Sequence, residues 1–334
     1  MLSRVKLENR PVLLLSLFLV VLVAFSSCSR WNTVALTPNL GKSGCGQSVD
    51  QPYTKEDMPK PIHEIALDTL LLQNFSFQSL NIANAIGVLD QLKDLLLLHK
   101  SYEEAPDLEK RIDIMAATHR INNTIASSAL EITAIASELD CEEERADQIA
   151  TYLKKKEDNA STLLTVGAIV VGASGAIAVG VLLANGLVGN FPDYIGIGTG
   201  LVEAALGILI LLNKKKVVYH HPRNALADIW LGTETSKIFP APVWYYLYYE
   251  HNGSDEPSIR IQLIDRWMSF GQIAKIKEKK KEKVYDLLFG EGGKYTAEQL
   301  FNRSDMHDQI EAQINLMSRH LRLLSVEIQS LDRG

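Results

Sequence analysis

The chain has 334 residues, of which 46% are hydrophobic and 22% are charged, and its formal net charge is −6. This mild acidic balance offers no general basic face for nucleic acid, and a mean hydropathy near zero excludes both a polytopic membrane protein and a disordered chain. The composition therefore predicts a soluble body with limited membrane-seeking segments and no nucleic-acid partner.

The N-terminus has the layout of a secretory signal. Three basic residues, Arg4, Lys6 and Arg10, precede an apolar run from Val12 to Val23. The sequence Ala24-Phe-Ser-Ser-Cys28 follows this run directly. A charged start, an apolar centre and small residues at the end are typical of a signal peptide, while an uncleaved signal anchor is the alternative.

The small residues before Cys28 resemble the lipobox of bacterial lipoproteins. This resemblance implies that residues 1–27 are removed as a signal peptide and that Cys28 carries the lipid. Phe25 stands where these lipoproteins more often have Leu. Ser29 follows Cys28 where the family uses Asp for retention at the inner membrane, so the resemblance favours the outer membrane of a bacterial cell envelope.

Residues 28–61 form a predicted flexible tether, because they are rich in Gly, Ser, Pro, Thr and Asn. With Cys28 lipidated, Cys45 and Cys141 remain as an even pair in an oxidising compartment. They form either a disulfide or two unrelated thiols. Neither has the spacing of a metal ligand, so we expect no metal and no cofactor.

Residues 62–160 are predicted to form a bundle of long helices. A first helix is expected from Ile62 to His99 and a second from Asp107 onward, because neither Gly nor Pro occurs between Pro106 and Gly167. Apolar and small residues of this second helix recur in steps of three and four and predict a coiled-coil-like seam. The residues of this seam are Leu108, Ile112, Met115, Ile125, Ala129, Ile132, Ala136 and Leu139.

Residues 161–213 are predicted to form an apolar helical hairpin. Ser161–Leu183 and Tyr194–Leu212 are each long enough to cross a hydrocarbon core of about 30 Å, and a segment rich in helix breakers joins them. Small residues at four-residue spacing let helix backbones approach closely in lipid. The residues of this predicted glycine zipper are Ala168, Gly172, Ala176, Gly180, Gly196, Gly200 and Ala204.

Two features of the hairpin bear on its environment. Glu203 interrupts the second apolar block, where an ionisable group is costly unless it pairs, is protonated or lines a cavity. The basic flanks Lys154–Lys156 and Lys214–Lys216 favour a cytoplasmic location for both ends, whereas an exported lipoprotein has them outside. The two signals agree if the flanks contact anionic headgroups outside the cytoplasm, or if the hairpin is sheltered in a soluble form and inserts later.

Residues 214–293 are predicted to be irregular or mixed, with a short helix near Arg223–Leu231. Val243–Tyr249 is aromatic and strand-like, and Ser258–Ile264 alternates with period two, so a β-hairpin is one interpretation. A helix from Ile259 through Phe270 is the other. The aromatic run is expected to pack in a core or to lie at a headgroup boundary.

Several residues of this segment carry catalytic side chains, namely His220, His221, Asp228, His251 and Asp255. Their spacing matches no metal or acid–base motif. We therefore expect no catalytic site and a protein that is not an enzyme.

Residues 294–334 are predicted to form a last bundle helix that pairs with the long helix. Thr296 and Gln299 resemble a capping box, and apolar residues keep four-three spacing to the end. These residues are Ile310, Ile314, Met317, Leu321, Leu324, Ile328 and Leu331. The predicted fold is mainly α, an elongated helical bundle or coiled coil with a central apolar hairpin and a small irregular or α+β insertion.

The arrangement of residues 62–334 resembles, in architecture, the α-helical pore-forming toxins of the cytolysin A and haemolysin BL type. The resemblance implies conditional membrane insertion and self-association. The lipid-linked N-terminus and residues 217–293 depart from that family.

The leading hypothesis is a lipid-anchored envelope protein whose hairpin inserts into or spans a membrane and oligomerises there, with membrane lipid as a partner. The alternative is a structural scaffold subunit of an envelope complex, with the hairpin as a permanent anchor.

Overall fold

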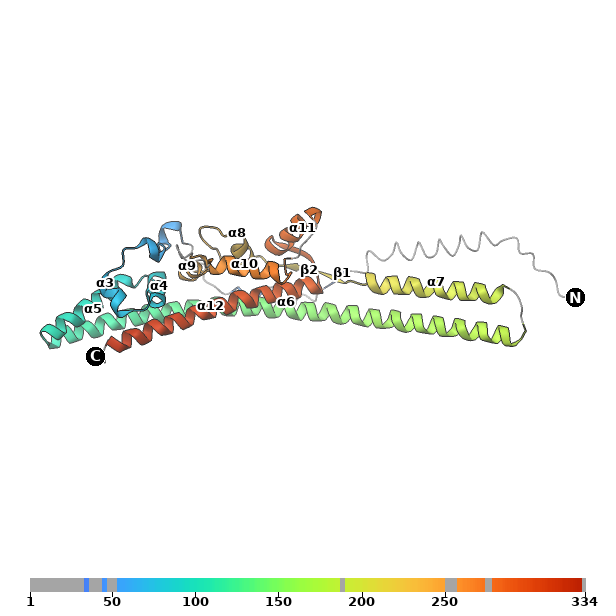
Figure 1. The fold of residues 1–334 in the computed structure, drawn as a ribbon, viewed down its shortest axis with the longest axis horizontal. Coiled ribbons are helices and arrows are strands. Elements are labelled where there is room, and N and C mark those ends of the chain that lie inside the picture. Colours follow the sequence, from blue (N-terminus) through green and yellow to red (C-terminus); the bar gives the residue numbers. More distant parts are fainter. Residues whose placement is uncertain are drawn as a thin grey trace. The chain divides into compact units, whose positions relative to one another are not determined.

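The computed structural model describes residues 33–35, 44–46, 53–186, 190–249, 257–273 and 278–331. The predicted signal peptide (1–27), Cys28, most of the predicted tether, His251 and Asp255 lie outside these residues. Within them the chain is mainly α, as predicted (Figure 1). In chain order the elements are β1 (Thr33–Val34), η2 (Lys55–Asp57), η3 (Ile62–Glu64), α3 (Thr69–Asn74), α4 (Phe77–Ala85), α5 (Leu89–Glu104), α6 (Leu108–Ala184), α7 (Phe191–Leu212), β2 (Lys216–His220), α8 (Ala225–Leu231), α9 (Ala241–Tyr248), α10 (Ile259–Ser269), α11 (Glu278–Phe289), β3 (Gly292–Thr296) and α12 (Ala297–Leu331).

The chain divides into two compact units. The hairpin unit comprises the described parts of residues 1–39, 149–218 and 294–297, and it contains the predicted apolar hairpin. The body unit comprises the described parts of residues 40–148, 219–293 and 298–334. The single helix α6 contributes to both units, since the division falls between Gln148 and Ile149.

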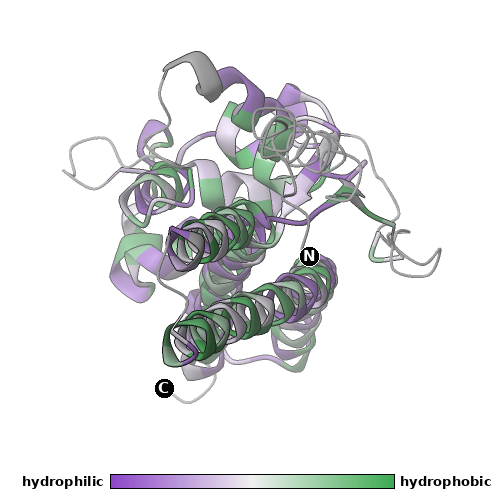
Figure 2. Cartoon of the chain, turned by 90° about the vertical axis from the view of Figure 1, so that its right-hand side faces the viewer, coloured by the Kyte–Doolittle hydropathy of each residue, from purple (hydrophilic) through white to green (hydrophobic). Residues whose placement is uncertain are grey.

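The core of the body unit is built on α6 and α12, which run alongside each other in opposite directions (Figure 1). The predicted apolar seam of α12 is buried from Ile310 to Ile328, and on α6 Ile132, Ala136 and Leu139 are buried as expected. Figure 2 shows the hydropathy of the described residues in an end-on view of the chain. Four-three spacing therefore predicted the buried stripe of α12 correctly.

At the start of α6 the predicted seam is wrong. Leu108, Ile112 and Met115 are exposed, while Ile114, Ala117 and Ile121 are buried. Both triplets are compatible with helical periodicity, and the shorter α5 and α4 rather than a long coiled-coil partner lie near this end (Figure 1). Periodicity identified the helix but could not decide which of its two apolar stripes faces the core.

The single helix predicted from Ile62 to His99 is also wrong, because the structure divides it into η3, α3, α4 and α5. Asp68 accepts a hydrogen bond from Leu70 N, and Ser76 accepts one from Ser79 N, so each side chain begins a new helix. Gly87 separates α4 from α5 with a φ of +72°, which glycine adopts without strain. The heavily apolar end of the segment is packed as predicted, with Leu92, Leu95 and Leu96 buried.

The mixed segment is more helical than predicted. The short helix near Arg223–Leu231 is confirmed as α8, and the helical interpretation of Ile259–Phe270 is confirmed as α10. The strand-like run at Val243–Tyr249 instead forms α9, so the β-hairpin is wrong. Val243, Trp244, Tyr245, Tyr246 and Leu247 are buried in succession, and a strand with one solvated face would alternate. Burial on all sides therefore overrides the β propensity of these aromatic residues.

A small sheet with strand order β1-β2-β3 was not predicted. Thr33 pairs with Lys216 and Val34 with Val217, in a parallel ladder. Burial alternates along β2, with Val217 and Tyr219 inside and Val218 exposed, but the sequence does not alternate because Val218 is apolar too. A two-residue strand such as β1 is too short to show a period.

Candidate functional site

The hairpin is formed by the end of α6 and by α7. Helix α6 continues without interruption to Ala184, and Gly186 follows with a φ of +72°. Asn190 precedes α7, whose second residue is Pro192, a position where its fixed φ suits a helix start. The apolar segments Ser161–Leu183 and Tyr194–Leu212 span roughly 35 and 29 Å at 1.5 Å per residue, about the thickness of a hydrocarbon core.

The two helices of the hairpin are antiparallel neighbours. At the base, Asn213 Nδ2 donates to Glu157 O at 3.1 Å and to Ser161 Oγ at 3.3 Å. Further along, Glu203 lies against Gly172 and Thr199 lies against Gly175. Since the contact position rises on α6 as it falls on α7, the helices are packed side by side in opposite directions.

The position of the hairpin that could least accommodate a side chain is Gly175. A Cβ added there would overlap Thr199 Cγ2 and lie 3.0 Å from Thr199 Cβ, an atom that can move only with the helix. At Gly172 the obstacle is Glu203 Oε1, the end of a flexible side chain. Gly175 is therefore the position where only glycine allows this helix spacing.

The predicted zipper residues do not all meet the partner helix. A Cβ on Gly180, Gly196 or Gly200 would find nothing within 4 Å, and Ala176 and Ala204 are exposed, whereas Ala168 is half-buried. Four residues turn a helix by about 400°, so a strict four-residue repeat drifts about 40° per step. The packed face therefore moves from Ala168 and Gly172 to Gly175 and leaves Gly180 outside.

The outer faces of the hairpin are exposed and aliphatic. In the most apolar stretch of 18 residues in α6, only 6% of the residues are buried. In the corresponding stretch of α7, none are buried. The exposed large side chains are Leu163, Val166, Ile169, Val170, Ile177, Val181, Leu183, Ile197, Leu201, Val202, Ile208, Leu211 and Leu212. Both helices are long and apolar enough to cross a membrane. The sequence also allowed a form in which the hairpin is sheltered from solvent. In this structure the hairpin is not sheltered.

Three hydroxyl groups of the hairpin are satisfied within their own helices. Thr165 donates to Ser161 O, Ser174 to Val170 O, and Thr199 to Ile195 O. Such back-bonding satisfies these three hydroxyls without water. The hairpin also contains a carboxylate, that of Glu203, which lies against the α6 backbone at Gly172 and is exposed.

The base of the hairpin is charged. No Lys or Arg occurs between Lys156 and Lys214. Lys154 pairs with Asp158 at 3.0 Å, and Glu157 Oε1 accepts a hydrogen bond from Lys215 N at 2.6 Å. The ends of the apolar segment are thus marked by polar residues of both helices.

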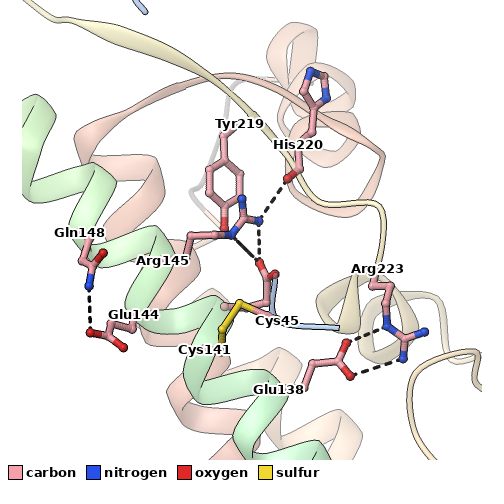
Figure 3. The surroundings of a disulfide bond; sticks show 10 residues. Cys45, Glu138, Cys141, Glu144, Arg145, Gln148, Tyr219, His220 and Arg223 are labelled. Carbon is pink, nitrogen blue, oxygen red and sulfur yellow. Dashed lines mark hydrogen bonds and ion pairs between the residues drawn. A yellow bond between two sulfur atoms is a disulfide. The ribbon is translucent and has the colours of Figure 1, made fainter. Parts of the chain in front are cut away.

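The body unit contains the disulfide between Cys45 and Cys141 that the sequence left open, with a Cα–Cα distance of 5.5 Å. Figure 3 shows it on α6 between two ion pairs. On one side Arg145 donates to Glu142 at 2.7 Å and to the carbonyl of His220 at 3.2 Å. On the other side Arg223 donates to Glu138 at 2.7 Å.

A buried polar group lies close to the Arg145 pair in the body unit, and we call it the histidine cluster. It consists of His221, His307, Arg145, Arg303, Glu142 and Tyr219, all of which are at least 90% buried. Burial, together with the charge of Arg303, lowers the pKa of His221 to about 3 and holds the pKa of His307 well below its usual value. From the sequence His221 was only a catalytic candidate, and His307 was not predicted to have a role. The one signal for His307 was its place one turn from the buried positions Arg303 and Ile310 on α12.

The other catalytic candidates have structural partners. Asp228 accepts hydrogen bonds from the hydroxyl of Ser236 and from Lys237 N, and His221 Nε2 lies 3.2 Å from the carbonyl of Leu287. His220 is exposed. These described residues are not brought together as a catalytic group.

Two further features of the body unit have no assigned role. Carboxylate oxygens of Asp140, Glu143 and Glu311 lie within 4.8 Å of one another, and burial with the neighbouring carboxylates raises the pKa of Glu143 to about 7. An open pocket of about 350 Å³ is lined by residues of α4, α9, α10 and α12, among them Asn81, Ser258 and Gln262. These three side chains bond to Tyr245, to the start of α10 and to Pro257, so the protein itself uses them.

No protein-family model, no curated protein and no solved structure matches this chain. The class of protein is therefore argued from its own geometry.

Proposed function

We propose that this chain is a lipid-anchored protein of a bacterial cell envelope whose hairpin inserts into or spans a membrane and associates there with further copies. The observation that carries this proposal is the hairpin itself, with two membrane-length helices packed through Gly175 and covered outside by exposed aliphatic residues. The lipid on Cys28 is the part of the proposal that comes from resemblance to the lipobox.

Energetics favour a non-aqueous environment for this hairpin. Burying one large aliphatic side chain is worth about 1.5–3 kcal/mol relative to leaving it in water. The outer faces carry more than ten such side chains, so covering them is worth tens of kcal/mol before the entropy of ordering is subtracted. Core helices of soluble proteins are covered by their own chain, whereas this hairpin is not.

Glu203 supports self-association of inserted copies. A charged carboxylate costs several kcal/mol at the centre of a bilayer unless it is paired, protonated or in contact with water. On α7 its carboxylate reaches α6 at Gly172 but is still exposed. Several hairpins arranged around a common lumen would give this group water, and that arrangement is a pore.

Liposome experiments test the proposal with a matched pair of substitutions. The mature chain (residues 28–334) with Cys28→Ser is added to vesicles of phosphatidylethanolamine and phosphatidylglycerol that contain a trapped dye. We expect flotation with the vesicles and dye release. Gly175→Leu forces the helices apart at Thr199, whereas Gly200→Leu adds the same side chain where nothing lies within 4 Å. We expect Gly175→Leu to reduce release at least tenfold and Gly200→Leu to change it less than twofold.

A scaffold subunit is the second candidate function. Leu108, Ile112 and Met115 are exposed on one face of α6 in the body unit, with spacing that suits a partner helix. For a scaffold, the mature chain would need detergent for solubility and would release no dye. A soluble chain that ignores vesicles would contradict both functions.

A further inference from the structure

The histidine cluster is unusual in its charge. Two guanidinium groups and one carboxylate are buried together with two imidazoles, so the formal charge is +1 with both imidazoles neutral and +3 with both protonated. Arg303 is fully buried, His221 and His307 are 1% exposed, and Arg145 is 9% exposed. Bulk water and salt screen charges at such depth only weakly.

The cluster fastens four elements of the body unit to one another. Arg145 and Glu142 come from α6, and Tyr219 and His221 come from the end of β2 and the residues after it. Arg303 and His307 come from α12, and Arg303 Nη1 donates to the carbonyl of Leu288 at 3.1 Å. Helix α11 also provides the carbonyl of Leu287 to His221 at 3.2 Å. Tyr219 OH donates to Glu142 at 3.2 Å, and the guanidinium of Arg145 lies 4.1 Å from the Tyr219 ring.

Charged and titratable neighbours offer little to a protonated imidazole. Among the described residues, the charged neighbours of the two histidines are Arg145 and Arg303. Glu142 and Tyr219 contact Arg145. Glu142 already accepts from Arg145 Nε, Arg145 Nη2 and Tyr219 OH. A proton added to either imidazole therefore creates a buried cation beside two others, and no described carboxylate is free to pair with it.

In sequence, the cluster lies beside two of the five junctions between the units, namely the two on either side of residues 149–218. Arg145 precedes the division at Gln148 by three residues, and Tyr219 is the first residue after the hairpin unit. Whatever loosens the hold of α6 and β2 within the body unit acts on the two segments that lead into the hairpin. This connection follows from the order of residues along the chain.

We propose that the histidine cluster is an acid-sensitive latch, in which protonation of His221 and His307 breaks the contacts among α6, β2 and α12 and thereby triggers membrane insertion of the hairpin. The trigger rests on the proposed function, whereas the latch does not. The signal is mild acid. After release, α6, β2 and α12 are packed less tightly against one another at the histidine cluster. The lowered pKa values of both imidazoles agree with this geometry.

The test measures stability and membrane action separately as functions of pH. Urea unfolding of the mature Cys28→Ser chain is compared with that of a His221→Gln, His307→Gln variant, since Gln keeps a donor near the Nε2 position and does not titrate. Each buried neutral histidine lowers the folding equilibrium constant about tenfold per pH unit below pH 6.5. We expect the folding constant of the wild-type chain to fall about 10³ to 10⁴ times more than that of the variant between pH 6.5 and about 4.5.

The control is a His119→Gln, His220→Gln variant, because both side chains are exposed and the chemical change is identical. We expect it to follow the wild-type profile. The carboxyls of Glu143 and Glu311, whose pKa values are raised by burial, favour folding as the pH falls, but they are present in all three chains and cancel in the comparison. If the double variant folds poorly, each single variant gives half of the expected difference in slope.

Dye release at each pH separates the two proposals. Release that rises further as the wild-type chain loses stability, with the rise at lower pH in the His221→Gln, His307→Gln variant, supports the latch as the trigger. Equal pH profiles of unfolding in the variant and the wild-type chain overturn the latch. A histidine-dependent unfolding profile without release at any pH keeps the latch, overturns the trigger and counts against the proposed function.

Discussion

Two stretches of helix α6 differ in what covers them. From Ile132 to Leu139 the helix buries its aliphatic side chains against the body unit. From Leu163 to Leu183 the side chains are of the same kind, and most of the large ones are exposed. Because one helix continues through both stretches, neither helix propensity nor composition explains the difference. A change of surroundings along a single helix is what a protein with one part in water and another in lipid requires.

The two stretches also hold their neighbours by different means. In the body unit a disulfide and buried ion pairs surround α6, whereas in the hairpin a glycine lies against a threonine. Electrostatic and covalent links suit a domain that folds in water. Close backbone packing suits helices in lipid, where burial of apolar surface no longer drives association. Substitutions in the body unit should therefore change the stability of the fold in water, and substitutions in the hairpin should change its action on membranes.

The largest effect is expected from the disulfide. It joins residues 96 apart in sequence, and closing a loop of this size stabilises the folded state by roughly 4–5 kcal/mol. Cys45→Ala with Cys141→Ala should lower the free energy of unfolding of the body unit by about this amount, as measured by urea denaturation. A loss below about 1 kcal/mol would show that the bond does not constrain the unfolded chain.

The buried ion pair comes next. Arg145→Met leaves Glu142 charged and buried, and breaking such pairs costs about 3–5 kcal/mol. Lys154→Met is the matched control on the same helix, because Lys154 and Asp158 are both more than half exposed. We expect the control to lose less than about 0.5 kcal/mol. Equal losses for the two variants in thermal or urea unfolding would contradict the contrast between the two parts of α6.

The Gly175→Leu substitution should act only in lipid. No residue of the body unit is changed, so the free energy of unfolding of the mature chain in urea should stay within about 0.5 kcal/mol of the wild-type value. Dye release should nevertheless fall, as described above. Parallel losses of body stability and of release would mean that the hairpin and the body unit fold as one.

The smallest effect concerns Glu143, whose pKa is raised to about 7 by burial first and by the carboxylates of Asp308 and Glu311 next. A carboxyl with a raised folded-state pKa destabilises the protein above that pKa, and the penalty disappears as the pH falls toward 4.5. Glu143→Gln should therefore raise the stability at pH 8 by up to about 1 kcal/mol, since the group is partly exposed, and should have little effect near pH 4.5. The pH dependence of urea unfolding would show the opposite trend if cation binding already compensates these charges.

Patterns that depend on one segment alone were predictable from the sequence. The long helix, the hairpin and the buried stripe of α12 follow from the absence of helix breakers and from regular spacing. Predictions that required a partner were less secure. At the start of α6 the buried stripe was wrong, and at α9 the aromatic residues were assigned to a strand, because in both cases tertiary packing decides the outcome.

The candidate site shows the same limit. Small-residue spacing indicated the hairpin interface, but the turn of the helix moves this interface to Gly175 and leaves Gly180 and Gly200 without a neighbour. The histidine cluster could not be predicted, because His221 and His307 are 86 residues apart and share no local pattern. Only the fold places both beside Arg303.

The most direct test of the central claim is the depth of the hairpin in a bilayer. A spin label is attached to a single cysteine at Leu201 on α7, or at Leu130 in the body unit, in the mature Cys28→Ser chain, where Cys45 and Cys141 are joined. Both sites are exposed, at 63% and 73%. With vesicles present, the label at position 201 should become accessible to oxygen and protected from a water-soluble relaxation agent, while the label at position 130 remains accessible to that agent. If both labels remain equally accessible from water, the hairpin does not enter the membrane, and the account fails at its centre.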